Sequence, residues 1–189
     1  MAYLAASGCK PALARHRQRR VAIRVAAFLV AAFLGMTQLL MVSAAWGQIP
    51  AMAGRIVDQA SILSTEDATQ IAKLLEAYER ETTHQIAVLT VRSLEGEAIE
   101  SFSLRIARAW QLGRRGDDNG IVLVVAPKER SVRIELGAGF ETFISNERAS
   151  EIISKDMVPS FKRGAWSEGI GRGVAQLMRD ARAYSVQKR

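Results

Sequence analysis

Two neighbouring carboxylates, Asp117 and Asp118, stand directly before an apolar run, IVLVVA at residues 121–126. Six apolar residues of this kind are typical of a buried β-strand. Asn119 and Gly120, which separate the acids from the run, favour a tight turn. The acids could bind a hard cation through their oxygens, or they could be solvated in the turn, and the spacing alone leaves both interpretations open.

Two better-known loop motifs are excluded. An EF-hand requires a glutamate six residues after its glycine, and the residue six after Gly120 is Ala126. The stretch ELGAGFE at 135–141 contains two glycines, but a dinucleotide-binding loop would need a third at position 142, which is Thr142. We therefore interpret ELGAGFE as a turn.

Cysteine and histidine are scarce, which limits the available chemistry. Cys9 is the only cysteine, and it precedes the folded part. After residue 45 the only histidine is His84, so a nucleophile–histidine apparatus would depend on one imidazole. Any metal bound by the folded part should be a hard cation held by oxygen.

The N-terminal 45 residues have the pattern of an export signal. Residues 10–24 are basic without an acid, and residues 25–42 are apolar without a charge. Small residues then allow cleavage after Ala44 or Ala45. The apolar stretch would also span about 27 Å as a helix, enough for an uncleaved anchor. Under either interpretation we expect residues 46–189 to be one extracytoplasmic domain, in the periplasm or secreted, anchored to a membrane only if residues 25–42 are retained.

The net charge comes from this leader. The chain has 26 Lys and Arg against 19 Asp and Glu. Six of the basic residues lie before residue 46, so the exported part is nearly neutral. No basic stripe with interleaved aromatics remains, and we expect no binding to nucleic acid.

Hydrophobic periodicity predicts alternating helices and strands. Ser64 and Asp67 form an S-x-x-D cap before a helical apolar stripe. A helix that starts near Ser145 should end at Pro159. Three glycines near the start of the last helix suggest a late helix start or a close approach to another backbone. The predicted elements are helices at 65–82, 98–111, 145–158 and around 170–184, and strands at 85–91, 121–126 and 131–136.

The order of these elements predicts an α/β fold, a small mixed sheet between helical layers. Strands 85–91 and 121–126 should be parallel because a helix connects them, and the four-residue PKER connection should return strand 131–136 antiparallel. The loop after that strand, which ends in Glu141, then lies beside Asp117 and Asp118. Carboxylates about 4 Å apart repel by about 4 kcal/mol at an effective dielectric constant near 20, which a cation would relieve.

A set of motifs in this order resembles the TPM domain family. The resemblance covers about residues 54–180. The motifs are VDQASILS (57–64), W-x-x-G (110–113), DDNGIVLVVA (117–126), VRIELGAGFE (132–141), P-x-F (159–161) and the glycine run 169–173.

The resemblance implies a three-layer, Rossmann-like α/β/α sandwich on the extracytoplasmic face of a membrane. Several family members bind calcium or other divalent ions through acidic loop residues, and some have a weak acid phosphatase activity. Carried over, the metal ligands would be Asp58, Asp117, Asp118 and Glu141. The expected function is a non-catalytic module that binds a divalent cation, Ca²⁺ in the first place, and assists or stabilises a membrane or envelope protein. The alternative is a metal-assisted phosphatase, with Arg114 and Arg115 to hold phosphate.

Overall fold

The computed structural model describes residues 49–140 and 143–187. By its internal contacts the chain divides into residues 1–46 and 47–189. The expected signal or anchor helix and the predicted ligand Glu141 lie outside the described residues. Within the described ranges, no helix is both long and apolar enough to cross a bilayer.

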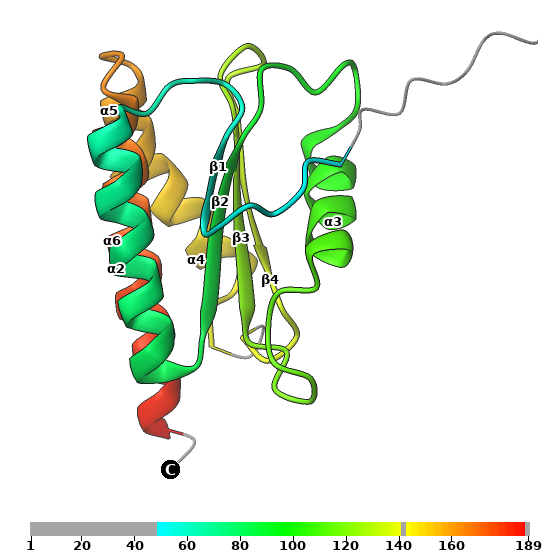
Figure 1. Ribbon diagram of the computed structural model, residues 1–189, viewed down its shortest axis with the longest axis vertical. Helices are drawn as coiled ribbons and strands as arrows, with labels where there is room; N and C mark the ends of the chain where they lie inside the picture. The colour runs from blue at the N-terminus through cyan, green and yellow to red at the C-terminus, as the bar shows by residue number, and fades with distance from the viewer. Residues whose placement is uncertain (1–48, 141–142, 188–189) are drawn as a thin grey trace, which may run out of the picture. The chain divides into compact units, whose positions relative to one another are not determined.

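The described domain is an α/β fold with a four-stranded mixed sheet (Figure 1). The sheet order is β1-β2-β3-β4, with the first three strands parallel and β4 antiparallel to β3. The elements are β1 (Ile56–Asp58), α2 (Thr65–Thr82), β2 (Gln85–Thr90), α3 (Ile99–Trp110), β3 (Gly120–Ala126), β4 (Ser131–Leu136), α4 (Asn146–Glu151), the π-helix η1 (Ile152–Met157), α5 (Val158–Phe161) and α6 (Trp166–Gln187).

Three strands and the two N-terminal helices form where the periodicity predicts them. Ser64 caps α2 as expected, because its hydroxyl accepts the Asp67 N–H at 3.0 Å. The sequence prediction missed β1, which is only three residues long and offers two apolar side chains, too few for a recognisable strand pattern. This missing strand matters for the site described below.

Helices cover both faces of the sheet, which gives three layers. Side chains of β2 and β3 alternate between the two faces, and every residue of β3 is buried. On one face α2 and α6 pack against Val88 and Leu123, and on the other α3 packs against Leu89 and Val122. Figure 1 shows α2 and α6 on one side of the strands and α3 on the other. The predicted α/β/α layering of the described domain is confirmed.

The loops that leave β1 and β2 turn to opposite faces of the sheet. β1 is followed by α2 and β2 by α3, and these two helices lie on different faces. Because the strand order advances in one direction through β1, β2 and β3, the two crossover connections have opposite hands. The two connections therefore diverge at the carboxyl ends of β1 and β2, and we call this place the switch point. The strand order itself does not reverse there.

The prediction that Pro159 ends a helix is wrong. Helical backbone continues from Asn146 to Phe161 because the residues before the proline form a π-helix. There the Val158 N–H reaches back five residues to the carbonyl of Ile153. The wider turn tolerates the absent proline N–H and relieves the clash of its ring with the preceding turn.

The glycines of α6 lie inside the helix, so the predicted late start is wrong and the predicted close approach is confirmed. A Cβ on Gly169 would lie 2.4 Å from the Phe161 ring and 3.0 Å from the carbonyl oxygen of Met157. A Cβ on Gly173 would lie 2.6 Å from the Met157 sulfur, whereas one on Gly171 would meet nothing within 4 Å. Two of the three glycines therefore let α6 pack tightly on η1 and α5.

Candidate functional site

Asp58 ends β1 and holds the loop that follows it. One carboxylate oxygen accepts the backbone N–H of Ile62 at 3.3 Å, and the other accepts that of Leu63 at 3.0 Å. The hydroxyl of Thr90, at the end of β2, also donates to Asp58. The same hydroxyl accepts the Ala60 N–H at 3.0 Å. This network fixes the loop between β1 and α2 against the end of the neighbouring strand.

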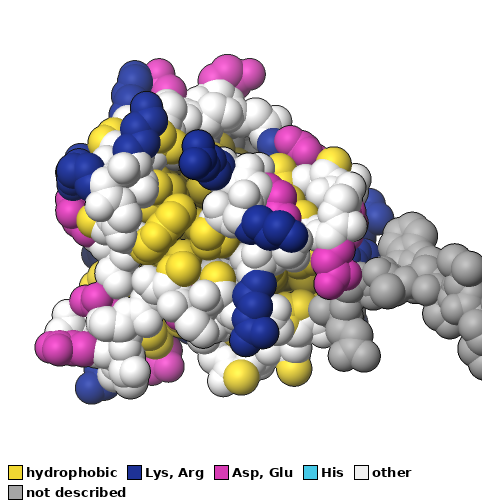
Figure 2. Space-filling model, turned by 90° about the horizontal axis from the view of Figure 1, so that it is seen from above, with side chains coloured by type: hydrophobic (Ala, Val, Ile, Leu, Met, Phe, Trp, Pro, Cys, Tyr) yellow, Lys and Arg dark blue, Asp and Glu magenta, His cyan; other side chains and the backbone are white. Residues whose placement is uncertain are grey.

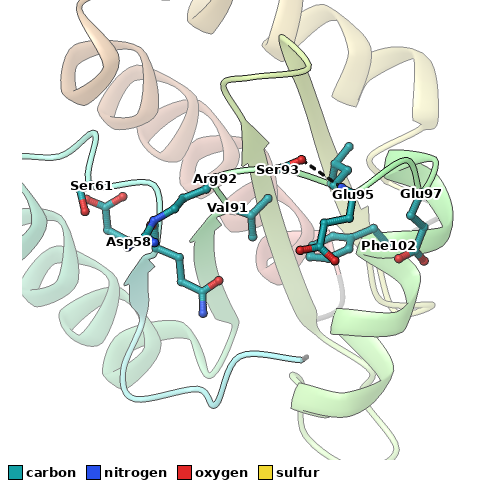
Figure 3. A pocket seen from close by; sticks show the side chains of 10 residues that line it. Asp58, Ser61, Val91, Arg92, Ser93, Glu95, Glu97 and Phe102 are labelled. Carbon is teal, nitrogen blue, oxygen red and sulfur yellow. Dashed lines mark hydrogen bonds between the residues drawn. The ribbon is translucent and has the colours of Figure 1, made fainter. Parts of the chain in front are cut away.

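A cavity of about 450 Å³ lies at the switch point, between the loop after β1 and the loop after β2 (Figure 3). We call it the switch-point cavity. In open α/β sheets, ligands bind outside the carboxyl ends of the strands, which is the edge where this cavity lies. The residues used below to define it are Asp58, Gln59, Ser61, Arg92, Glu95 and Glu97.

The switch-point cavity carries more acid than base. Three carboxylates line it, those of Asp58, Glu95 and Glu97, against one cation, Arg92. Arg92 uses its Nε to donate to the Gln59 carbonyl at 3.0 Å. Glu97 pairs with Arg105 at 2.6 Å. The oxygens of Asp58, Glu95, Gln59 and Ser61, on the two loops that border the cavity, are of the kind that hard cations bind.

Glu129, in the β3–β4 turn, holds the second loop of the cavity in place. Its carboxylate accepts the Ser93 hydroxyl at 2.7 Å and the Leu94 N–H at 3.1 Å. Burial raises the pKa of Glu129, but the hydrogen bonds from Ser93 and Leu94 and the charge of Lys128 outweigh it and lower the pKa below its ordinary value. The anionic form is therefore the one that orders this loop.

The sequence reasoning did not find Gln59, Glu95 or Glu129. Ligands of open α/β sheets bind at the carboxyl ends of the strands, and this rule would have indicated Gln59 and Glu95. Applying it requires β1, which no sequence pattern predicts. Glu129 lies in the PKER turn and is far in sequence from the loop it holds, so only the fold brings the two together.

The other candidate acids, Asp117 and Asp118, lie at the amino edge of the sheet, before β3. As predicted, the loop after β4 packs beside them: Gly139 donates its N–H to the Asp118 carbonyl at 3.2 Å. A Cβ on Gly137 would lie 2.1 Å from the Asp118 oxygen, and one on Gly139 would lie 2.0 Å from the Asp117 oxygen. Only glycine fits at these two contacts.

Asn119 fixes the shape of this amino-edge loop. Its side-chain oxygen accepts the Arg114 N–H at 2.8 Å, and its side-chain nitrogen donates to the Thr83 carbonyl at 3.1 Å. Asn119 is buried, whereas the Asp118 side chain is exposed, and Asp118 adopts a left-handed backbone conformation with φ 46°. The arrangement presents the Asp118 carboxylate to solvent.

The predicted metal ligands that the structure describes, Asp58, Asp117 and Asp118, do not share one site. Asp58 pairs with Thr90 at the end of β2, while the start of β2 pairs with Gly120, next to Asp117 and Asp118. The two groups are therefore separated by the length of a six-residue strand, about 20 Å. In the residues that the structure describes, no three Asp, Glu, His or Cys side chains are grouped closely enough to hold a metal ion. An ion bound at either edge would keep much of its water.

His84 is a core residue at the amino edge. It is 3% exposed, its Nδ1 lies 3.1 Å from the Tyr78 hydroxyl, and its ring meets Phe140 edge-on at 4.9 Å between centroids. Because His84 directly precedes β2, the length of that strand separates it from the switch-point cavity. It is in no position to move protons there.

Comparison with known proteins places the domain in a family. The profile of the TPM domain matches residues 56–180. The N-terminal domain of a protein from P. gingivalis, solved by NMR, is 31% identical with a TM-score of 0.63, and the match covers 69% of this chain and 83% of that one. No curated protein matches the chain.

Two further NMR structures share the fold. The N-terminal domain of the cg2496 protein from Corynebacterium glutamicum is 16% identical, with a TM-score of 0.50 and coverage of 75% of this chain and 84% of that one. The BA42 protein from Bizionia argentinensis is also 16% identical, with a TM-score of 0.57 and coverage of 65% and 83%. With the profile match and the 31% identical relative, these observations show that the chain belongs to the TPM domain family.

Proposed function

We propose that this chain is an extracytoplasmic TPM-domain module that binds a divalent cation weakly in the switch-point cavity and assists or stabilises a membrane or envelope protein. The observation that carries the proposal is the acidic cavity between the diverging loops of β1 and β2. The location rests on the export pattern of residues 1–45, and attachment to the membrane requires that residues 25–42 be retained.

Ca²⁺ is the expected ion because the donors are carboxylate, amide, hydroxyl and water oxygens in irregular loops. Asp58 is already committed to three hydrogen bonds, so it anchors the loop and contributes at most a remaining lone pair. Glu95 is exposed and is the acid best able to move towards an ion. With few ligands fixed in advance, the affinity should resemble that of extracellular modules, about 10⁻⁴ to 10⁻³ M.

A module is favoured over a phosphatase because the described residues lack an arranged set of reacting groups. Arg114 and Arg115, the candidate phosphate ligands, lie at the amino edge beside Asp117 and Asp118. His84 is close to that edge but buried in the core. Phosphatase activity that persists through purification and is lost in Asp117→Asn would favour the phosphatase over the non-catalytic module.

A calcium titration of the full chain tests the proposal. With a Kd near 1 mM, 10 mM Ca²⁺ should stabilise the fold by about 1.4 kcal/mol, which raises the melting temperature by about 5 °C. Glu95→Gln should remove most of this increase. Glu76→Gln, which removes an exposed carboxylate from α2, is the matched control and should leave it intact.

The position of the ion is read from NMR chemical-shift changes during the same titration. Shifts centred on residues 59–61 and 92–97 support the switch-point cavity. Shifts centred on residues 114–119, with loss of stabilisation in Asp118→Asn but not in Glu95→Gln, would move the ion to the predicted amino-edge site. A melting curve unchanged by Ca²⁺ would reject cation binding at both edges.

A further inference from the structure

A second cavity, of about 500 Å³, lies between the β3–β4 turn and the junction of α5 and α6. It belongs to the opposite helical layer from α3, because Val132 and Phe161 pack against the core under α2 and α6. We call it the basic cavity and define it by Arg130, Val132, Val158, Phe161, Lys162 and Trp166.

Two aromatic rings form a fixed wall of the basic cavity. The rings of Phe161 and Trp166 lie 4.8 Å apart between centroids at 33°, and both side chains are only partly buried. Gly169 leaves just enough room for the Phe161 ring. The turn between the two aromatics is tied at its ends, because the Ser160 hydroxyl donates to Glu168 at 3.0 Å. The wall therefore exists before any ligand binds.

Two cations face the same cavity without a counter-charge. Arg130 and Lys162 are exposed, and no side-chain hydrogen bond or ion pair involves either of them in the part of the chain that the structure describes. Nearby Arg163, by contrast, is paired with Glu168 at 3.1 Å. Among the described residues, no carboxylate lines the basic cavity, whereas three line the switch-point cavity.

The surface shows the same combination of apolar and basic groups. Figure 2 looks onto the end of the domain where the β3–β4 turn and α5 lie at the top of Figure 1, and it shows exposed apolar side chains in a hollow bordered by Lys and Arg. Pockets of this size that combine apolar walls with a few charged groups are typical of small-molecule sites. Attraction by two unpaired cations selects an anion.

We propose that the basic cavity binds a small organic anion with a flat apolar body, such as an aromatic carboxylate. The body lies against the Phe161–Trp166 wall and the side chains of Val132 and Val158. The anionic head lies between Arg130 and Lys162. The site is independent of the switch-point cavity and needs no metal ion.

The probe pair is 2-naphthoate and its neutral analogue 2-naphthamide, each titrated into the full chain by calorimetry without calcium. We expect naphthoate to bind about fivefold more tightly than the amide, which is the advantage expected from two exposed cations. The double variant Arg130→Gln, Lys162→Gln should remove this preference and leave the affinity for the amide unchanged. The matched control, Lys73→Gln with Arg115→Gln, removes two exposed cations elsewhere and should keep the preference.

The apolar half of the site is tested with Trp166→Leu, in a preparation shown to keep the wild-type melting temperature. This variant should lower the affinities for both probes by the same factor. The NMR signal of the Trp166 indole should shift with naphthoate in the wild type and in the control variant. Equal affinity for the two probes, an acid preference that survives in the double variant, or no binding up to about 10 mM would each overturn the proposal.

Discussion

Thr90 donates its hydroxyl to Asp58, which lines the switch-point cavity, and this hydrogen bond joins the ends of two adjacent parallel strands. Thr90 is fully buried, and its oxygen also accepts the Ala60 N–H. The pair thus ties the loop after β1 to the end of β2. Asp58, one of the predicted metal ligands, therefore has a structural role in holding the two strand ends together.

The first prediction concerns this pair. Thr90→Val keeps the shape of the side chain but leaves the Ala60 N–H without its acceptor and takes one donor from Asp58. An unsatisfied buried group costs about 1–3 kcal/mol, so the free energy of unfolding in urea should fall by that amount. Thr69→Val, on the exposed face of α2, should change it by less than about 0.5 kcal/mol. Equal effects of the two variants would show that Thr90 does not hold the loop.

The second prediction uses two glycines of the same helix. Gly171→Ala should raise the free energy of unfolding by up to about 1 kcal/mol, because alanine favours a helix and its Cβ meets nothing there. Gly169→Ala should lower it by about 1–3 kcal/mol, because the Cβ would overlap the Phe161 ring. Thermal denaturation of both variants measures the contrast. Stabilisation by both would mean that α6 does not pack on α5 as closely as described.

The Gly169 variant also bears on the basic cavity. A displaced Phe161 ring would disturb the aromatic wall. Gly169→Ala should therefore lower the affinity for 2-naphthoate and for 2-naphthamide alike, whereas Gly171→Ala should leave both affinities unchanged.

The third prediction concerns acid stability. The pKa of Glu129 is lowered in the folded state, so its contribution to stability is present above the unfolded-state pKa and is lost as the pH falls through the folded-state pKa. Glu129→Gln should therefore reduce the melting temperature at pH 7 and lessen its fall between pH 6 and pH 3. Glu76→Gln serves as the control and should follow the wild type. An unchanged acid profile in Glu129→Gln would mean that the hydrogen bonds to Ser93 and Leu94 do not depend on the charge.

Local pattern was sufficient for most of the fold. The S-x-x-D cap at Ser64 and the apolar stripe behind it predicted α2 with its observed bounds. The short PKER connection predicted the β3–β4 hairpin, and from it the convergence of the Asp118 loop with Gly137 and Gly139. These inferences succeed because each depends on residues close together in the sequence.

The switch-point cavity could not be predicted in the same way. It exists because α2 and α3 lie on opposite faces of the sheet, and the face that each helix covers depends on packing across the whole domain. The strand rule that favours right-handed crossovers would have placed both helices on one face. Likewise, no residue near Pro159 indicates that a π-helix accommodates the proline. The wider turn is stabilised by the packing of Met157 beneath α6, which is distant in sequence.

The fourth prediction concerns alkaline stability and the buried pair of Tyr78 and His84. Burial raises the pKa of Tyr78 to about 12, against the opposing influence of Thr82 and Arg182. Above pH 10 the unfolded chain loses the phenol proton while the folded chain keeps it, so the stabilisation present below pH 10 is lost as the pH rises towards 12. Two pH units correspond to roughly 2–3 kcal/mol.

Tyr78→Phe removes this titration. The variant should be less stable at pH 7, by about 1 kcal/mol, because the contact with His84 Nδ1 is lost. Between pH 10 and 12 its free energy of unfolding should then fall less steeply than that of the wild type. The ultraviolet titration of the three tyrosines supplies an independent reading: one should ionise late, and that late component should be missing from the variant. Parallel stability curves above pH 10 would show that the Tyr78 hydroxyl reaches solvent in the folded protein.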